Sequence, residues 1–88
     1  MKIVIYSSSI CPYCVAAKNI FLKLNYNYKE ILIDNNPEVK RQMIRISNGR
    51  TTVPQIFIGP KHLGGYDDLK KILDSGELMK MLDKQNEN

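Results

Sequence analysis

An apolar run at the start of the chain leads through a short loop into a helix start that carries two cysteines. Residues 2–6 (KIVIY) are typical of a buried strand. The loop SSS follows, and then CPYC at residues 11–14, where Pro12 suits the first position of a helix. A second strand pattern comes after the helix. This order predicts a βαβ unit with parallel strands and a right-handed crossover.

The first half of the chain continues with clear helix and strand signals. A helix is expected over residues 12–25 and a strand over 28–33, with Ile31 and Ile33 on one face. Asn36 and Pro37 are typical of a helix N-terminus, and Gly49 of its end. The residues expected to bury the faces of these two helices are Cys14, Ala17, Phe21 and Leu24 in the first, and Val39, Met43 and Ile46 in the second.

The second half predicts a hairpin and a further helix. Strands are expected at 55–58 and near 62–63, joined by the turn Gly59-Pro60. The sequence GGYDD then begins a helix that buries Leu69, Ile72 and Leu73 and breaks at residues 75–76. A last turn or two is expected over 77–82. We therefore predict an α/β fold of order βαβαββα, with one domain over 1–83 and a frayed polar tail over 84–88.

Composition narrows the function. The chain has 88 residues and a net charge of +4, from 13 basic and 9 acidic residues. This charge suits an anionic ligand or an acidic partner, but it lacks the basic stripe of a nucleic-acid binder. No run reaches the roughly 20 apolar residues of a membrane helix, and residues 1–6 are too short for a signal-peptide core. We expect a cytoplasmic protein, and in a reducing compartment a CxxC pair is catalytic or metal-binding more often than structural.

Three kinds of chemistry compete for Cys11 and Cys14. A structural zinc site needs four ligands, and the chain offers one further candidate, His62, which reads as an exposed hairpin residue. A permanent disulfide across two residues would constrain almost no loop. Cα atoms about 5 to 6 Å apart suit a disulfide that opens and closes, so redox chemistry is favoured and no metal is expected.

The two thiols are not equivalent. Cys11 faces the free amides and positive dipole of a helix N-terminus, which predicts a pKa of roughly 7 or below. Cys14 shares a face with Ala17 and Phe21 and should be buried. Cys11 is therefore the expected nucleophile and Cys14 the resolving cysteine.

Three motifs together resemble the dithiol glutaredoxins, and the similarity covers nearly the whole chain. They are CPYC, the segment RTTVPQIFIG at 50–59, and GGYDD at 64–68. The resemblance implies a thioredoxin-like fold, with a four-stranded mixed sheet of order 2-1-3-4, three main helices and a short C-terminal one. It implies reduction of glutathione mixed disulfides and protein disulfides, with glutathione as co-substrate and no permanently bound cofactor. It also implies a monomer, with ribonucleotide reductase as a plausible partner.

The resemblance further implies a glutathione site. A cis bond before Pro54 would direct the Val53 backbone towards the ligand, although Thr52-Val53-Pro54 can also be read as an ordinary strand start. Asp67 would accept the ligand's ammonium or merely cap the helix, and Arg41 would bind its glycine carboxylate or remain a solvated charge. The implied contacts are Tyr13, Arg41, Thr52, Val53, Pro54, Gly65, Tyr66 and Asp67.

One departure from the family concerns residue 8. Many members carry a lysine there, three residues before the first cysteine, and this chain has Ser8. We expect a less acidic Cys11 or weaker glutathione binding than in lysine-bearing relatives. Lys18 lies too far along the helix to replace it.

Two rival functions stay open at this point. One is a dimer that bridges an iron–sulfur cluster through Cys11 and glutathione, against which Pro12-Tyr13 argues. The other is a redoxin reduced by a flavoenzyme, against which the charged pair Arg41 and Asp67 counts.

Overall fold

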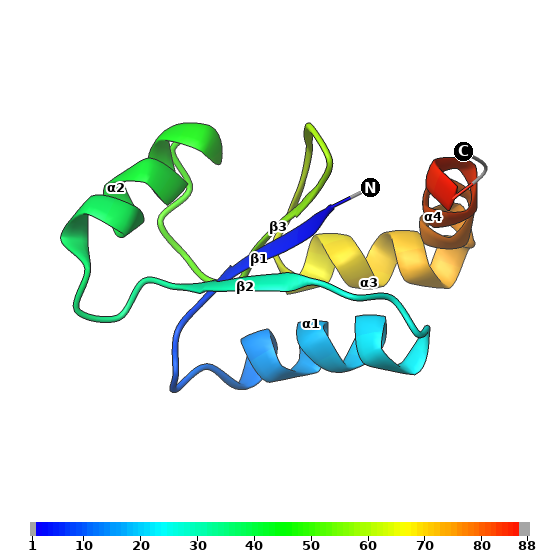
Figure 1. Cartoon of the computed structure of the whole chain (residues 1–88), viewed down its shortest axis with the longest axis horizontal. Coiled ribbons are helices and arrows are strands. Elements are labelled where there is room, and N and C mark those ends of the chain that lie inside the picture. The colour runs from blue at the N-terminus through cyan, green and yellow to red at the C-terminus, as the bar shows by residue number, and fades with distance from the viewer. Residues whose placement is uncertain (1, 87–88) are drawn as a thin grey trace.

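The computed structural model describes residues 2–86. A central sheet carries helices on both faces, and Figure 1 shows α1 and α3 together on one side and α2 on the other. The elements in chain order are β1 Ile3–Ser7, α1 Pro12–Lys23, β2 Lys29–Leu32, α2 Pro37–Ile46, β3 Gln55–Ile58, β4 Lys61–Gly64, α3 Tyr66–Ser75 and α4 Glu77–Asn86.

The sheet has the order β2-β1-β3-β4, which confirms the prediction. β1 pairs with β2 in parallel, as a βαβ unit requires, and with β3 antiparallel. In the β1–β3 register, Ile5 lies opposite Ile56 and Tyr6 opposite Gln55. This register brings the end of β1, where the cysteine loop begins, beside the start of β3.

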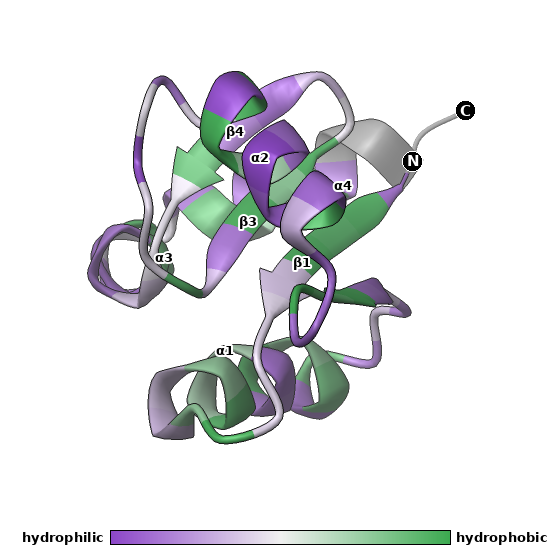
Figure 2. Ribbon diagram, turned by 90° about the vertical axis from the view of Figure 1, so that its left-hand side faces the viewer, coloured by the Kyte–Doolittle hydropathy of each residue, from purple (hydrophilic) through white to green (hydrophobic). Residues whose placement is uncertain are grey.

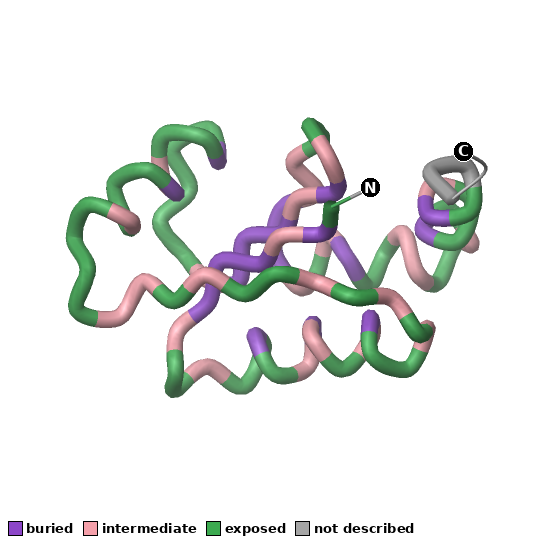
Figure 3. The backbone as a smooth tube through the Cα atoms, viewed as in Figure 1, coloured by how far each residue is buried: buried purple, intermediate pink, exposed green. Residues whose placement is uncertain are grey.

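The hydrophobic core lies between the sheet and the α1–α3 layer, and α4 closes one end of it. The predicted positions Ala17, Phe21 and Leu69 are fully buried there, while Ile72 and Leu73 are half-buried against the same cluster. The backbone tube in Figure 3 shows the buried positions gathered on the strands and on the inward turns of the helices.

Helix α2 is less buried than its sequence pattern predicted. Asn36 caps it as expected, because its Oδ1 accepts a hydrogen bond from the Val39 amide at 3.3 Å. Met43 is fully buried, but Ile46 is 42% exposed, so the expected three-residue stripe was wrong at its last member. Ile46 is the final residue of the helix, and α2 is mostly hydrophilic and exposed along its length (Figures 2 and 3).

Two smaller differences concern the ends of elements. α1 stops at Lys23 because Asn25 takes a left-handed φ of 62°. α4 continues to Asn86 and thus extends into the predicted polar tail, of which residues 87–88 lie outside the described part of the chain. No helix within residues 2–86 has the length and apolar character needed to cross a membrane.

Replacing the buried Leu69 should reveal how much the contact between α3 and the sheet contributes to the free energy of unfolding. We expect Leu69→Ala to lower the free energy of unfolding by about 2–5 kcal/mol, since it deletes buried methyl groups and leaves a cavity. Leu22 is 56% exposed, so Leu22→Ala should cost less than about 0.5 kcal/mol. Urea unfolding of both variants measures this. Equal losses would contradict the assigned core.

Candidate active site

Cys11 is the residue that caps helix α1. Its φ and ψ of −139° and 101° are extended, and its carbonyl accepts hydrogen bonds from the amides of Cys14 and Val15, each at 3.1 Å. Its Sγ also accepts from the Cys14 amide at 3.1 Å. A sulfur at this position faces the positive end of the helix dipole, as the sequence predicted.

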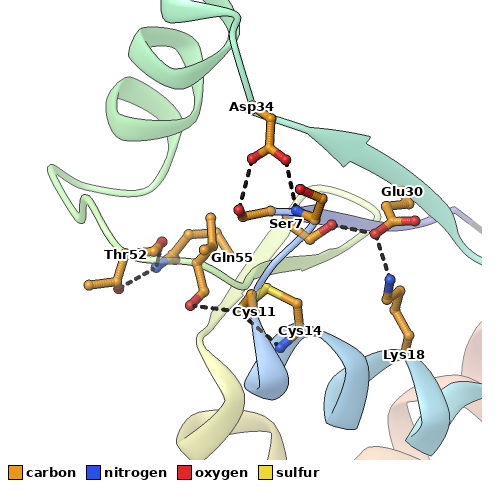
Figure 4. Close-up of a disulfide and its surroundings, with 11 residues drawn as sticks. Ser7, Cys11, Cys14, Lys18, Glu30, Asp34, Thr52 and Gln55 are labelled. Carbon is orange, nitrogen blue, oxygen red and sulfur yellow. Dashed lines mark hydrogen bonds and ion pairs between the residues drawn. A yellow bond between two sulfur atoms is a disulfide. The ribbon is translucent and has the colours of Figure 1, made fainter.

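The two cysteines form a disulfide, and their Cα atoms are 5.2 Å apart (Figure 4). Cys14 is fully buried, whereas Cys11 is partly exposed. The predicted asymmetry in burial is therefore confirmed. Of the two cysteines, Cys11 is therefore the one that an incoming molecule can approach.

The loop before β3 lies against Cys11. The Val53–Pro54 peptide bond is cis, and the Val53 carbonyl oxygen is 3.8 Å from the Cys11 Sγ. Gln55, fully buried, donates from Nε2 to the Thr52 carbonyl at 3.0 Å and lies 3.3 Å from the Thr52 hydroxyl. Figure 4 shows Gln55 and Thr52 beside the disulfide. The strand β3 thus holds this loop in place through a buried side chain.

His62, on the neighbouring strand β4, holds the Gln55 side chain in place. Its Nε2 is 2.7 Å from the Gln55 Oε1, and its ring stacks on Phe57 with centroids 4.8 Å apart. It is partly buried, so reading it as an exposed hairpin residue was wrong. Burial and the nearby Arg50 charge lower the pKa of His62, which favours the neutral form of its ring.

A groove of about 230 Å³ opens beside Cys11. It brings together every predicted glutathione contact except Arg41, and it adds Arg50, to which the sequence analysis gave no role. Its lining residues are Tyr13, Arg50, Thr52, Val53, Pro54, Gly65, Tyr66 and Asp67. Arg41 lies outside this lining, exposed on α2 and 3.4 Å from Glu38. The place of Arg50 in the motif RTTVP was the signal that could have identified it.

The two aspartates at the start of α3 have different roles. Asp68, not Asp67, caps the helix: its Oδ2 accepts from the Gly65 amide at 2.9 Å and pairs with the Arg50 Nη1 at 2.9 Å. These contacts lower the pKa of Asp68, the Gly65 amide contributing most. Asp67 is exposed at the groove and makes no side-chain hydrogen bond or ion pair within residues 2–83.

Gly64 is needed for this arrangement. Its φ is +116°, and a Cβ there would collide with the Asp68 carboxylate and lie 2.6 Å from the Arg50 Nη1. The ion pair that positions Arg50 over the groove therefore depends on the absence of a side chain at residue 64.

The loop before Cys11 is held by an acidic residue. Ser8 donates from Oγ to the Asp34 Oδ1 at 2.8 Å, and the Ser9 amide donates to Oδ2 at 2.9 Å (Figure 4). Hydrogen bonds from Ser9 first, and then from Ser8, lower the pKa of Asp34. Sequence reasoning missed this contact, which joins residues 25 and 26 positions apart.

A second polar cluster joins α1 to the sheet. Glu30 accepts from the buried Ser7 hydroxyl at 2.5 Å and from the Lys18 Nζ at 2.7 Å (Figure 4). These two donors, Lys18 foremost, lower the pKa of Glu30. Lys18 is therefore engaged with β2. Within the described residues no group of three or more His, Cys, Asp or Glu side chains is arranged to hold a metal ion.

Comparison with known proteins gives a consistent result. The family model described as Glutaredoxin matches residues 3–63. Glutaredoxin 1 of Rickettsia prowazekii is 45% identical over 87 residues, covering 98% of this chain and 92% of that protein. Glutaredoxin 3 of Escherichia coli is 44% identical over 78 residues, covering 89% and 93%. The crystal structure of a buckwheat glutaredoxin–glutathione complex superposes with a TM-score of 0.85 at 32% identity, covering 93% of this chain and 76% of that one.

The titration of His62 should make stability depend on pH. Because its pKa is lowered in the folded protein, the unfolded chain binds more protons, and the free energy of unfolding should fall as the pH drops from about 7 towards 5. The variant His62→Gln should have a flatter profile in this window. Both proteins should lose further stability below about pH 4.5, where carboxylates with lowered pKa values take up protons.

Urea unfolding at stepped pH values measures both effects. If the free energy of unfolding has the same slope between pH 7 and 5 in both proteins, the role assigned to His62 is wrong.

Proposed function

The chain belongs to the glutaredoxin family and is a thiol–disulfide oxidoreductase with a Cys11–Cys14 pair, and on this premise we propose that it reduces glutathione mixed disulfides and protein disulfides with glutathione as its electron donor. The observation that carries the proposal is the position of the Cys11 sulfur. It caps α1, is partly exposed, and lies 3.8 Å from Val53 beside a groove lined by Arg50 and Asp67.

The proposed reaction starts from the reduced pair. The Cys11 thiolate attacks the glutathione sulfur of a mixed disulfide, the protein thiol leaves and takes up a proton, and Cys11 becomes glutathionylated. A second glutathione attacks this disulfide and leaves as oxidised glutathione, which returns Cys11 to the thiolate. The Cys14 amide, which donates to the Cys11 Sγ, would stabilise the charged sulfur in both steps.

Protein disulfides would follow a second route that uses both thiols. Cys11 attacks and forms a mixed disulfide with the substrate protein. Cys14, directly below it, displaces the substrate and leaves the Cys11–Cys14 disulfide. Two glutathione molecules then supply the two electrons that reopen it. The 5.2 Å between the Cα atoms suits this exchange without large backbone movement.

The groove suits the chemistry of glutathione, an extended tripeptide with two carboxylates and one ammonium. We propose that the backbone of Thr52 and Val53 pairs with its cysteinyl residue beside Pro54. Gly65 and Tyr66, at the start of α3, would hold the γ-glutamyl carboxylate, and Asp67 the ammonium. Tyr13 also lines the groove, and the centroid of its ring is 5.5 Å from that of the Tyr66 ring.

Two arginines compete for the remaining carboxylate. Arg41 was the sequence-based candidate, whereas Arg50 lines the groove and is positioned by Asp68. We assign the contact to Arg50 for this reason, and Arg41 stays a candidate that the experiment below tests. Guanidinium groups bind carboxylates through two parallel hydrogen bonds, so either side chain is chemically suited.

We propose glutathionylated and disulfide-bonded proteins as the physiological substrates, with ribonucleotide reductase among them, and a monomer acting in the cytoplasm. The partly exposed Cys11 of the CxxC pair supports this, since in a reducing compartment such pairs serve catalysis more often than structure. With Ser8 bonded to Asp34 in place of the family lysine, we expect a Cys11 that is less acidic than in lysine-bearing relatives.

Replacing each cysteine separately tests the division of labour. Cys14→Ser should keep most turnover of a glutathionylated peptide, because that route needs only Cys11, and should lose at least about ten-fold in the reduction of a protein disulfide. Cys11→Ser should abolish both. Coupled assays with glutathione, its reductase and NADPH measure the rates. Loss of both activities in Cys14→Ser would refute the assignment.

Replacing the two arginines separately tests the groove. Arg50→Gln should raise the KM for glutathione about ten-fold, since a charged hydrogen bond to a carboxylate is worth about 1.5–3 kcal/mol. Arg41→Gln is the matched control and should change KM less than two-fold. Asp68→Asn removes the ion pair while keeping Arg50 and reports any structural contribution. The reverse ranking of the two arginines would restore the sequence-based choice.

A further inference from the structure

A second groove, which the proposed chemistry does not use, lies between helices α1 and α3. Its volume is about 270 Å³, and its lining residues are Ile20, Lys23, Leu24, Tyr66, Lys70 and Leu73. The two helices pack against each other on one face of the sheet (Figure 1). Both start at the end of the molecule that holds Cys11, so the groove runs away from the active site along the helices.

Tyr66 lines both this groove and the one beside Cys11, so the two grooves are adjacent. The paired rings of Tyr13 and Tyr66 lie at the junction. A substrate polypeptide that is bound at Cys11 and crosses these rings would therefore enter the space between α1 and α3. The second groove therefore lies within reach of a substrate chain that is bound at Cys11.

The groove has an apolar floor and a basic rim. The floor consists of three partly buried side chains, which pack against the hydrophobic core on one side and are partly exposed in the groove on the other: Ile20, Leu24 and Leu73. Lys23 makes no side-chain hydrogen bond or ion pair within the described residues. Lys70 pairs with Asp74 at 2.8 Å, but this pair is exposed on one helix and such pairs exchange partners at little cost.

We propose that this groove is a docking site for the polypeptide of a disulfide-bonded substrate, and that it selects a segment in which an apolar side chain is flanked by acidic residues. The apolar side chain would fill the floor, and the carboxylates would meet Lys23 and Lys70. The proposal rests on the proposed function, because it supplies the selectivity for protein substrates that a glutathione groove alone lacks.

The spacing of the motif follows from helix geometry. Ile20 and Leu24 are 9 and 13 residues beyond Cys11, and at a rise of about 1.5 Å per residue they lie about 14–20 Å along α1. An extended peptide covers this distance in about four to six residues, at about 3.3–3.6 Å each. The selected segment therefore lies about five residues from the substrate cysteine.

Matched peptides test the proposal. Each carries one glutathionylated cysteine in a Gly/Ser background, with Glu-Leu-Glu, Lys-Leu-Lys or Glu-Ser-Glu centred five residues before or after it. We expect kcat/KM for Glu-Leu-Glu to exceed that for Lys-Leu-Lys by about ten-fold in one of the two directions, and to fall with added salt. Glu-Ser-Glu should lie between them. Equal values for all peptides would overturn the proposal.

Charge reversal on the protein supplies the second arm. Lys23→Glu and Lys70→Glu should each reduce the preference for Glu-Leu-Glu about two- to five-fold. Lys61→Glu is the matched control, because Lys61 is exposed on the β3–β4 hairpin, whose tip points away from α1 (Figure 1). All three variants should turn over the small mixed disulfide of glutathione and 2-mercaptoethanol at the wild-type rate. A loss in Lys61→Glu as large as in Lys23→Glu would overturn the assignment.

A binding measurement separates this proposal from the proposed function. The Glu-Leu-Glu peptide with serine in place of cysteine should shift the amide NMR signals of residues 20–24 and 70–73, whether or not the protein turns over any disulfide. Failure of turnover on the small mixed disulfide would count against the proposed function alone. Shifts produced by dodecanoate and not by the peptide would reassign the groove to a small anionic amphiphile and overturn the docking proposal.

Discussion

The antiparallel pairing of β1 with β3 is the constraint on which the site depends. With Tyr6 opposite Gln55, the loop that leaves β1 and the loop that enters β3 meet at the same end of these two central strands. The Cys11 sulfur therefore comes within 3.8 Å of the Val53 carbonyl oxygen. The register is strongly specified because Ile5 and Ile56, which face each other, are both fully buried. A slip by one residue would turn these side chains outward and separate the two loops.

Polar side chains outside the groove lining then hold each loop in a single arrangement. Asp34 ties the loop before Cys11 to the end of β2, and Gln55 ties Thr52 to β3. Asp68 does the same for the turn into α3 and at the same time positions Arg50. The groove is thus built by residues that do not line it, which leaves Asp67 and the exposed part of the Arg50 guanidinium for a ligand.

The same packing explains why a second groove lies next to the active-site groove, between the helices. α1 and α3 both begin beside Cys11 and bury one face on the sheet, so their outer faces leave a shallow apolar furrow between them. Tyr66 lines both grooves, so it lies between the proposed glutathione site and the proposed docking site. Chemistry and substrate selection can therefore be altered by substitutions at different residues.

The sheet order was inferred from the resemblance to the glutaredoxins, whereas the sequence by itself determined the order of elements and the placement of both cysteines. Those features depend on residues within one or two turns of each other: Pro12 and Cys11 at the start of α1, Asn36 at the start of α2, and Gly76 after α3. Seven of the eight implied groove contacts also followed, because they belong to contiguous motifs. Tertiary structure alone decided that Arg50 lines the groove and Arg41 does not, that Asp68 caps α3 while engaging Arg50, that Ser8 bonds to Asp34, and that His62 is partly buried. The ion pair between Arg50 and Asp68 joins residues 18 positions apart, and the hydrogen bond between Ser8 and Asp34 joins residues 26 positions apart. No local sequence pattern encodes which distant side chains the packed sheet brings together.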